Sequence, residues 1–310
     1  MNITTMTFIF VLLTAHTLLS QHAFPIADNS TIIAAADTIP FTLGLDNRIY
    51  IQGTINNEQP IDFIFDTGAE GIWLYKSGLT KSSTIIFHGQ STISGVGGDI
   101  NSEYSLNNTL RVANHIWNNR TVDYSGVQMH NNDGGIGYKL FEESNIELNF
   151  DNGLLIIHDS LFIPENGYTQ CRLQKRNNNY FIEVTLNSGV KKIDEWFHFD
   201  TGSSGSLNIH NESIAAQNLY SAMKRIGEHK ASGIGQGVIN FERVILPKLE
   251  IGGYELVKIP ISLEIPSNTE GLPFGIIGID ILKRFNIILD FQRSIAYLKP
   301  NSLFHSFFKN

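Results

Sequence analysis

The chain has 310 residues, of which 42% are hydrophobic and 17% charged, enough apolar material for about two ordinary domains. This composition excludes intrinsic disorder as the main state, and a mean hydropathy of −0.05 excludes a polytopic membrane protein. The formal net charge of −8 disfavours nucleic acid as a partner, because an acidic surface repels phosphate backbones. A single cysteine excludes an internal disulfide and a multi-cysteine metal site.

An apolar run over residues 8–19 predicts a signal peptide at residues 1–20. The run is shorter than the roughly 20 residues that cross a bilayer, and small residues follow it at Ser20 and Ala23. We therefore expect an exported protein, periplasmic or secreted, with no membrane span in the mature chain. An uncleaved anchor or an apolar start to the fold are the alternatives. Residues 21–40 are interpreted as an N-terminal segment or a short propeptide.

The rest of the chain contains three segments that each occur twice, in the same order. They are FIFDTGAEG at 63–71 and FHFDTGSSG at 197–205, SGVG at 94–97 and SGIG at 232–235, and the longer segments 134–157 and 275–298. Three recurring blocks in one order indicate a duplicated unit rather than chance similarity. We expect an N-terminal lobe at 41–163, a solvated linker at 164–178, a C-terminal lobe at 179–300 and a tail at 301–310 that packs against the protein.

The periodicity within each copy is that of β-strands. Short β-branched and aromatic runs, such as residues 49–55 and 180–186, end in turn-forming residues. Short helices are expected only at 139–143, 213–225 and 280–285. The glycine-rich blocks near 94–98 and 232–237 are typical of hairpin tips, where glycine tolerates a positive φ. The sequence therefore predicts a mainly β protein.

Two Asp-Thr-Gly motifs, at residues 66–68 and 200–202, each follow an aromatic-x-aromatic strand. A later apolar segment ending in glycine follows in each copy, at 135–137 and 276–278, and Trp73 lies seven residues after the first aspartate. With these motifs the chain resembles the aspartic peptidases, the pepsin and retropepsin superfamily, over nearly all of residues 45–300. Its two glycine-rich hairpins and the alanine after the first motif make it similar to single-chain, tandem-lobe retropepsin-like proteases of bacteria.

The resemblance implies two homologous retropepsin-like β-barrel lobes in one chain, with the active site at their interface. It implies an aspartic endopeptidase that acts on a peptide or protein substrate, with Asp66 and Asp200 as its catalytic residues. It also implies support from the loop residues Thr67, Gly68, Thr201, Gly202 and Ser203, and flaps at Gly95, Gly97, Gly233 and Gly235. In this family the two threonine hydroxyls donate hydrogen bonds across to the opposite loop.

Paired aspartates suit peptide hydrolysis because the reaction needs a base for water and an acid for the carbonyl group. Two adjacent carboxylates cannot both ionise, so they share one proton and provide both functions without a metal or cofactor. Ser203 could donate a hydrogen bond to ionised Asp200, whereas Ala69 offers Asp66 no such donor. We therefore expect Asp200 to be the more acidic member and Asp66 to carry the shared proton more often.

Two features depart from the family pattern. Retropepsins often carry Gly-Arg-Asp or Gly-Arg-Asn where this chain has Gly137-Tyr138-Lys139 and Gly278-Ile279-Asp280. A pepsin-type flap tyrosine is not identifiable, and Tyr104 is the nearest candidate.

Two other function classes stay open. One is a catalytically silent, protease-like module that binds a peptide or protein, and the other is a two-carboxylate glycosidase. Scattered histidines without paired-ligand spacing give no expectation of a metal. Because both motifs lie in one chain, we expect activity as a monomer.

Overall fold

The computed structural model describes residues 38–129, 131–158, 164, 166–213, 215, 219, 223–235, 237–266 and 274–308. The chain divides into two compact units, Met1–Ile33 and Ala34–Asn310, and every described residue belongs to the second. This unit is mainly β, as the sequence predicts. The predicted signal peptide lies outside the described residues, and within them no helix is long and apolar enough to cross a membrane.

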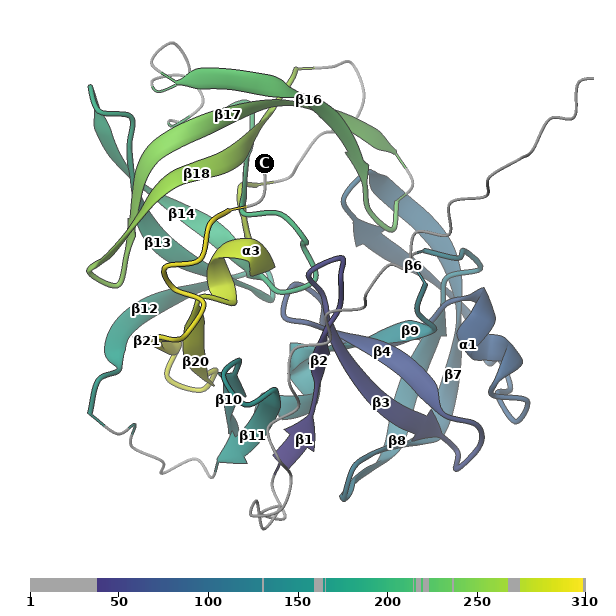
Figure 1. Cartoon of the computed structure of the whole chain (residues 1–310). Coiled ribbons are helices and arrows are strands. Elements are labelled where there is room, and N and C mark those ends of the chain that lie inside the picture. Colours follow the sequence, from purple (N-terminus) through teal and green to yellow (C-terminus); the bar gives the residue numbers. More distant parts are fainter. Residues whose placement is uncertain are drawn as a thin grey trace, which may run out of the picture. The chain divides into compact units, whose positions relative to one another are not determined.

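The first sheet has eight strands in the order β2-β3-β4-β9-β5-β8-β7-β6 (Figure 1). Their bounds are β2 Thr42–Leu43, β3 Ile49–Ile55, β4 Ile61–Asp66, β5 Ile72–Leu74, β6 Gly89–Gly95, β7 Gly98–Val112, β8 His115–Tyr124 and β9 Gly134–Gly137. An additional pairing of β3 with β7 joins six of these strands in a closed ring, β3-β4-β9-β5-β8-β7. The short helix α1, Lys76–Thr80, follows β5.

The second sheet has thirteen strands in the order β1-β11-β10-β20-β21-β12-β13-β14-β19-β15-β18-β17-β16. The bounds before the second motif are β1 Thr38–Pro40, β10 Asn145–Asn149, β11 Leu154–His158, β12 Thr169–Arg176, β13 Asn179–Asn187 and β14 Lys192–Asp200. Those after it are β15 Leu207–Ile209, β16 Lys224–Ser232, β17 Val238–Ile251, β18 Tyr254–Glu264, β19 Ile276–Gly278, β20 Phe285–Asp290 and β21 Ile295–Pro300. An additional β13–β17 pairing closes the ring β13-β14-β19-β15-β18-β17.

The two rings have the same strand order when each strand of the first ring is matched to the corresponding strand of the second. The strands that carry the Asp-Thr-Gly motifs, β4 and β14, each pair in parallel with the strand of the later apolar-glycine segment, β9 and β19. In these registers Asp66 lies opposite Gly137, and Asp200 lies opposite Gly278. The repeated sequence blocks therefore occupy equivalent positions in the two rings of strands.

Strands from the two repeats also pair directly with each other. β10 runs antiparallel to β20, from Asn145 opposite Asp290 to Leu148 opposite Ile287, and Figure 1 shows these strands side by side. β12 pairs with both β21 and β13. The segment 164–178, expected to be a solvated linker, thus contains a regular strand with Leu173 buried on it. The polar residues of this segment favour a solvated linker, but in the structure they occupy the exposed positions of a strand.

Short helices follow the two repeated segments that end in Ile-Gly, at residues 135–137 and 276–278. The 3-10 helix η1, Tyr138–Phe141, and the helix α3, Ile279–Leu282, lie near the two positions expected at 139–143 and 280–285. The helix expected at 213–225 falls mostly outside the described residues, and its last two residues begin β16.

The C-terminal tail packs against the protein through Arg284, whose side chain is buried. The Arg284 Nη1 atom donates to the carbonyl oxygens of Leu303 and Ser306 at 3.2 and 2.5 Å. The guanidinium also lies 3.6 Å from the centre of the Phe308 ring. The tail is therefore held by backbone hydrogen bonds and a cation–π contact to one arginine, consistent with the expectation that it packs down.

Candidate active site

Each aspartate of the two motifs stands at the end of a strand that is anchored in the core. Phe63 and Phe65 on β4, and Phe197 and Phe199 on β14, are at most 1% exposed. Successive side chains of a strand point to opposite faces, so these phenylalanines fix which way the following residues face. Burial of such large rings contributes about 2–3 kcal/mol each, which makes the strand ends rigid supports.

The glycines opposite the two aspartates are required by close backbone packing. A Cβ atom at Gly137 would lie 2.3 Å from the carbonyl oxygen of Ala69, and one at Gly278 would lie 2.4 Å from that of Gly205. Both distances are far inside van der Waals contact. The glycines of the repeated Ile-Gly segments therefore allow each aspartate loop to lie directly on the neighbouring strand.

The two Asp-Thr-Gly loops are locked together by four reciprocal hydrogen bonds of two threonines. The amide of Thr67 donates to Thr201 Oγ1, and the amide of Thr201 donates to Thr67 Oγ1, both at 3.0 Å. The hydroxyl of Thr67 donates to the carbonyl oxygen of Phe199, and that of Thr201 to the carbonyl oxygen of Phe65, both at 2.9 Å. All these groups are buried, so each would cost about 1–3 kcal/mol if left unpaired.

This lock places each carboxyl group over the glycine of the opposite loop. A Cβ atom at Gly68 would lie 2.8 Å from Asp200 Cγ, and one at Gly202 would lie 2.4 Å from Asp66 Cγ. The two carboxyl groups hydrogen bond to each other. The structure therefore brings the sequence-predicted residues Asp66 and Asp200 together, with one threonine and one glycine from each motif around them.

Burial is the largest influence on the pKa of both carboxyl groups. It raises the pKa of Asp66, and the negative charge of Asp200 and the hydrogen bond between the two carboxyls raise it further. Burial also raises the pKa of Asp200, while hydrogen bonds from Asp66 and from backbone amides act in the opposite direction. A buried pair of this kind holds one proton between its two members over a wide pH range.

Backbone donors make the pair asymmetric. Asp66 Oδ1 accepts one amide hydrogen bond, from Gly68 at 2.8 Å, whereas Asp200 Oδ1 accepts two, from Gly202 at 2.8 Å and Ser203 at 3.0 Å. Donors to a carboxylate favour its ionised form, so the negative charge is biased to Asp200 and the proton to Asp66. The donor recorded at Ser203 is the backbone amide rather than the hydroxyl expected from the sequence, and the bias of the shared proton toward Asp66 stays a prediction.

A cation near the dyad comes from a segment that the sequence analysis did not consider. Arg48 Nε donates to the carbonyl oxygen of Gly202 at 3.1 Å, and its charge lowers the pKa of Asp200 against the larger effect of burial. Asp46 holds this guanidinium through a 3.0 Å ion pair. Asn47 of the same turn donates to the carbonyl oxygen of Ser204. Arg48 belongs to no motif and stands at no characteristic spacing from Asp66. Its contact with the second loop therefore could not be predicted from the sequence.

The departure at Gly137-Tyr138-Lys139 places an exposed ion pair beside the first loop, with Lys139 Nζ 3.0 Å from Glu70. In the second repeat, Lys283 Nζ lies 2.6 Å from Asp280 and donates to Asn47 Oδ1 at 2.8 Å. The positions that correspond to the retropepsin arginine are held by Tyr138 and Ile279, which are both buried, and the two lysines pair with carboxylates nearby.

The two glycine-rich hairpins meet at their tips. Gly235 donates to the carbonyl oxygen of Val96 at 3.2 Å, and Gly237 donates to that of Gly97 at 3.0 Å. A Cβ atom at Gly97, which has a φ of +88°, would lie 2.6 Å from the Gly237 carbonyl oxygen. The hairpins β6–β7 and β16–β17 therefore contact each other through bare backbone, and Gly95, Gly97, Gly233 and Gly235 all lie at this contact.

Each hairpin tip also packs on an apolar cluster from the opposite repeat. Ile234 packs on the buried side chains of Ile64, Trp73 and Tyr75. Val96 packs in the same way on buried residues of the second repeat, namely Ile239, Phe241 and Ile276. A cavity of about 400 Å³ opens beside the second hairpin, lined by Val127, Gln128, Met129, Ser232 and Gly233.

Three aromatic residues of the first repeat take different positions around the hairpin and the dyad. Tyr104, the nearest flap-tyrosine candidate, pairs with Gly89 in the body of the hairpin and covers that glycine. Tyr75 is 3% exposed, and its pKa is raised by burial and also by the charge of Asp66, which places it near the dyad. Trp73 fills the space over Gly135 and belongs to the buried cluster that also contains Ile64 and Tyr75.

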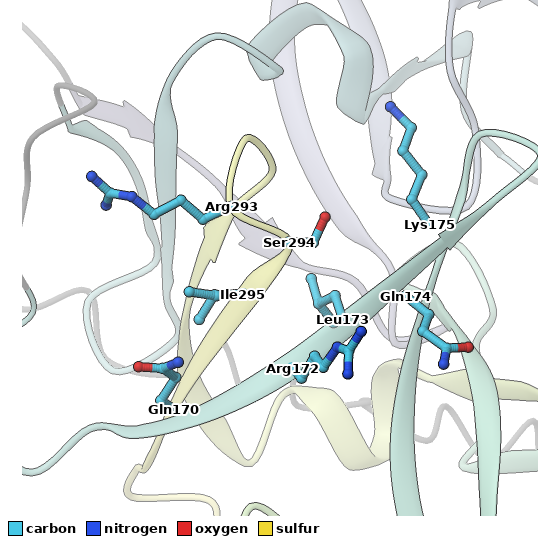
Figure 2. A pocket seen from close by; sticks show the side chains of 8 residues that line it. All are labelled: Gln170, Arg172, Leu173, Gln174, Lys175, Arg293, Ser294 and Ile295. Atoms are coloured by element: carbon cyan, nitrogen blue, oxygen red, sulfur yellow. The ribbon is translucent and has the colours of Figure 1, made fainter.

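A second cavity, of about 530 Å³, lies between β12 and the β20–β21 turn (Figure 2). Three basic side chains line it, and Figure 2 shows Arg293 and Lys175 extending in different directions. Arg293 pairs with Asp290 at 3.1 Å and Lys175 with Glu142 at 2.5 Å. None of its lining residues belongs to the motif loops or the hairpin tips, and no group of metal-ligating side chains is found in the described part of the chain.

The aspartate pair is therefore the one arrangement described above that combines close carboxyl groups with symmetric support from two loops. No model of a known protein family matches the chain, and a search of curated protein sequences also finds no match.

Proposed function

We propose that this protein is an aspartic endopeptidase, built from two retropepsin-like lobes, with Asp66 and Asp200 as its catalytic residues. The observation that carries the proposal is the pair of buried carboxyl groups, each placed over the glycine of the opposite loop and held by reciprocal threonine hydrogen bonds. Two carboxyl groups held at fixed positions at the ends of rigid strands are typical of groups that act together on one reacting atom.

The chemistry follows from the shared proton. Asp200, which accepts two backbone amide bonds, is the better carboxylate and takes a proton from the attacking water. Asp66, which holds the shared proton, donates a hydrogen bond to the carbonyl oxygen of the peptide bond as negative charge develops there. The proton accepted by the pair then passes to the amine that leaves, and the pair returns to its singly protonated form.

The hairpins supply the cover of the reaction site. An extended peptide between the dyad and the tips would meet the backbone of Val96, Gly97 and Gly235, whose hydrogen bonds across the tips would open to allow bonds to its main chain. The apolar clusters beneath Ile234 and Val96 would take the side chains that flank the cleaved bond. No metal or cofactor is required by this scheme.

Digestion of a mixed peptide library from pH 3 to pH 8 tests the proposal. We expect cleavage that a statine-type inhibitor blocks and that the Asp66→Asn variant lacks. Folded protein that cuts no peptide at any pH would contradict the proposal and favour a silent peptide-binding module. Peptides that co-purify with the protein, identified by mass spectrometry, would then support that second function.

A further inference from the structure

One residue breaks the symmetry of the two repeats beside the dyad. His198 occupies the position in β14 that Ile64 occupies in β4, two residues before the aspartate. Residues two apart on a strand share a face, so the imidazole lies on the same side of β14 as the carboxyl group of Asp200. The two neighbouring phenylalanines point the other way, into the core.

His198 is buried without a hydrogen-bond partner for one ring nitrogen. The residue is 4% exposed, and among the described residues its Nε2 atom has no partner. Its ring centre lies 4.9 Å from that of Phe274 and 5.5 Å from that of Phe181. A buried polar atom left unpaired costs about 1–3 kcal/mol, so such an atom in a native fold needs an explanation.

Its surroundings connect the imidazole to the proposed substrate cleft. His198 pairs with Ile276 across the β14–β19 ladder, and both Ile276 and Phe274 belong to the cluster that receives the hairpin tip at Val96. Burial lowers the pKa of His198 to about 4, while the charge of Asp66 acts in the opposite direction. The imidazole is therefore neutral at neutral pH and lies within the electrostatic reach of the dyad.

The equivalent site in the first repeat has no such group. Ile64 packs with Trp73 and Tyr75 beneath the other hairpin tip, Ile234. The two repeats thus differ in chemistry at this position, where one has an aliphatic side chain and the other an imidazole with an unpaired nitrogen.

We propose that His198 is a specificity-determining residue, whose free Nε2 atom hydrogen bonds to an uncharged polar substrate side chain on one side of the cleaved bond. This inference rests on the proposed peptidase function. A neutral imidazole can donate to or accept from an amide or hydroxyl group, so Gln, Asn, Ser and Thr are the side chains that fit. Asp and Glu do not fit, because the dyad beside the site already carries a negative charge.

The test compares kcat/KM for peptides that carry Gln or Leu at each of the two positions flanking the cut bond. For the wild-type protein we expect a Gln-to-Leu ratio about tenfold higher at one position than at the other, the size of one good hydrogen bond. His198→Leu should remove this difference, because it gives both halves an aliphatic residue. His198→Asn, which keeps a hydrogen-bonding group, should retain part of the difference.

Two controls make the result specific. Ile64→Leu alters the equivalent position of the other half and should leave the ratio on the His198 side unchanged. Thermal unfolding of each variant shows whether the protein is folded, and the wild-type profile alone already tests the inference. Equal apolar preference at both positions, or a polar preference that survives in His198→Leu, would overturn it while leaving the dyad intact. Cleavage that does not depend on Asp66 or Asp200 would instead overturn the peptidase function and the role of His198 together.

Discussion

At the scale of single residues, the two motif glycines set the distance between the carboxyl groups. A methyl group at Gly202 would fall 2.4 Å from Asp66 Cγ, so Gly202→Ala must displace that carboxyl from its partner. Because the proposed catalysis requires the two carboxyl groups in register, we expect kcat to fall by about 100-fold or more. Steady-state kinetics on one peptide measures this.

Gly205→Ala is the matched control for that experiment. Gly205 lies in the same loop, but a Cβ atom there would have its nearest neighbour at 3.8 Å, an ordinary contact. Its kcat should stay within a few-fold of the wild-type value. Equal losses in both variants would mean that the loop as a whole, rather than the carboxyl position, is sensitive to substitution.

The raised pKa values of the two aspartates also predict how stability depends on pH. A carboxyl with a raised folded-state pKa favours folding below the pKa of the unfolded chain, about 4, and this contribution is lost as pH rises toward the folded-state value. Asparagine does not ionise and suffers no such loss. The double variant Asp66→Asn, Asp200→Asn should therefore exceed the wild type in free energy of unfolding at pH 7.

Urea unfolding at pH 4 and pH 7 measures this difference. The gap between the double variant and the wild type should be smaller at pH 4, where about half of the unfolded chain's aspartates are already protonated. A gap that is the same at both pH values would show that asparagine acts through packing rather than through the cost of a buried charge.

At the scale of elements, the two hairpins must separate for a polypeptide to enter. A Cβ atom at Gly95 would lie 3.9 Å from the Cβ of Ile234, close to the value of about 3.8 Å found in disulfides. Gly95→Cys combined with Ile234→Cys should therefore form a disulfide that joins the tips. We expect the oxidised protein to lose more than 90% of its peptidase activity and to regain it with a reductant.

The native thiol does not complicate that experiment. Cys171 is the only cysteine of the chain, and burial raises its pKa to about 11, so it is a poor partner in disulfide exchange. Each single cysteine variant should respond to neither oxidant nor reductant. Full activity of the cross-linked protein on a folded protein substrate would show that the tips need not part.

Sequence could predict those elements whose residues carry their own signal. The strands leading to Asp66 and Asp200 and the hairpins have alternating or glycine-rich patterns that hold in any context. β12 was missed because its basic and amide residues read as a solvated segment, and only pairing with β21 and β13 makes it a strand. Tertiary pairing overrides local composition there.

The same distinction applies to the candidate site. The aspartates, threonines and glycines are contiguous in the motifs, and the expectation that the two motifs meet comes from the resemblance to aspartic peptidases. Arg48 and Tyr75 reach the dyad from other segments, and the unpaired nitrogen of His198 depends on what packs around it. No spacing in the chain specifies such contacts.

At the scale of the whole molecule, the two repeats are joined within one polypeptide. The β10–β20 pairing aligns backbone from both repeats, and the threonine lock joins their loops. We therefore expect specific activity to be constant on dilution from micromolar to nanomolar protein. A fall in specific activity that tracks dissociation in sedimentation experiments would show that a second copy contributes to the site.

The central claim is that the two aspartates act as one catalytic unit, and its most direct test compares Asp66→Asn with Asp200→Asn on a single peptide. Both substitutions preserve size and hydrogen bonding but prevent the pair from sharing a proton. The account predicts that each variant alone loses at least about a thousandfold in kcat while remaining folded. Activity retained in either variant would contradict it.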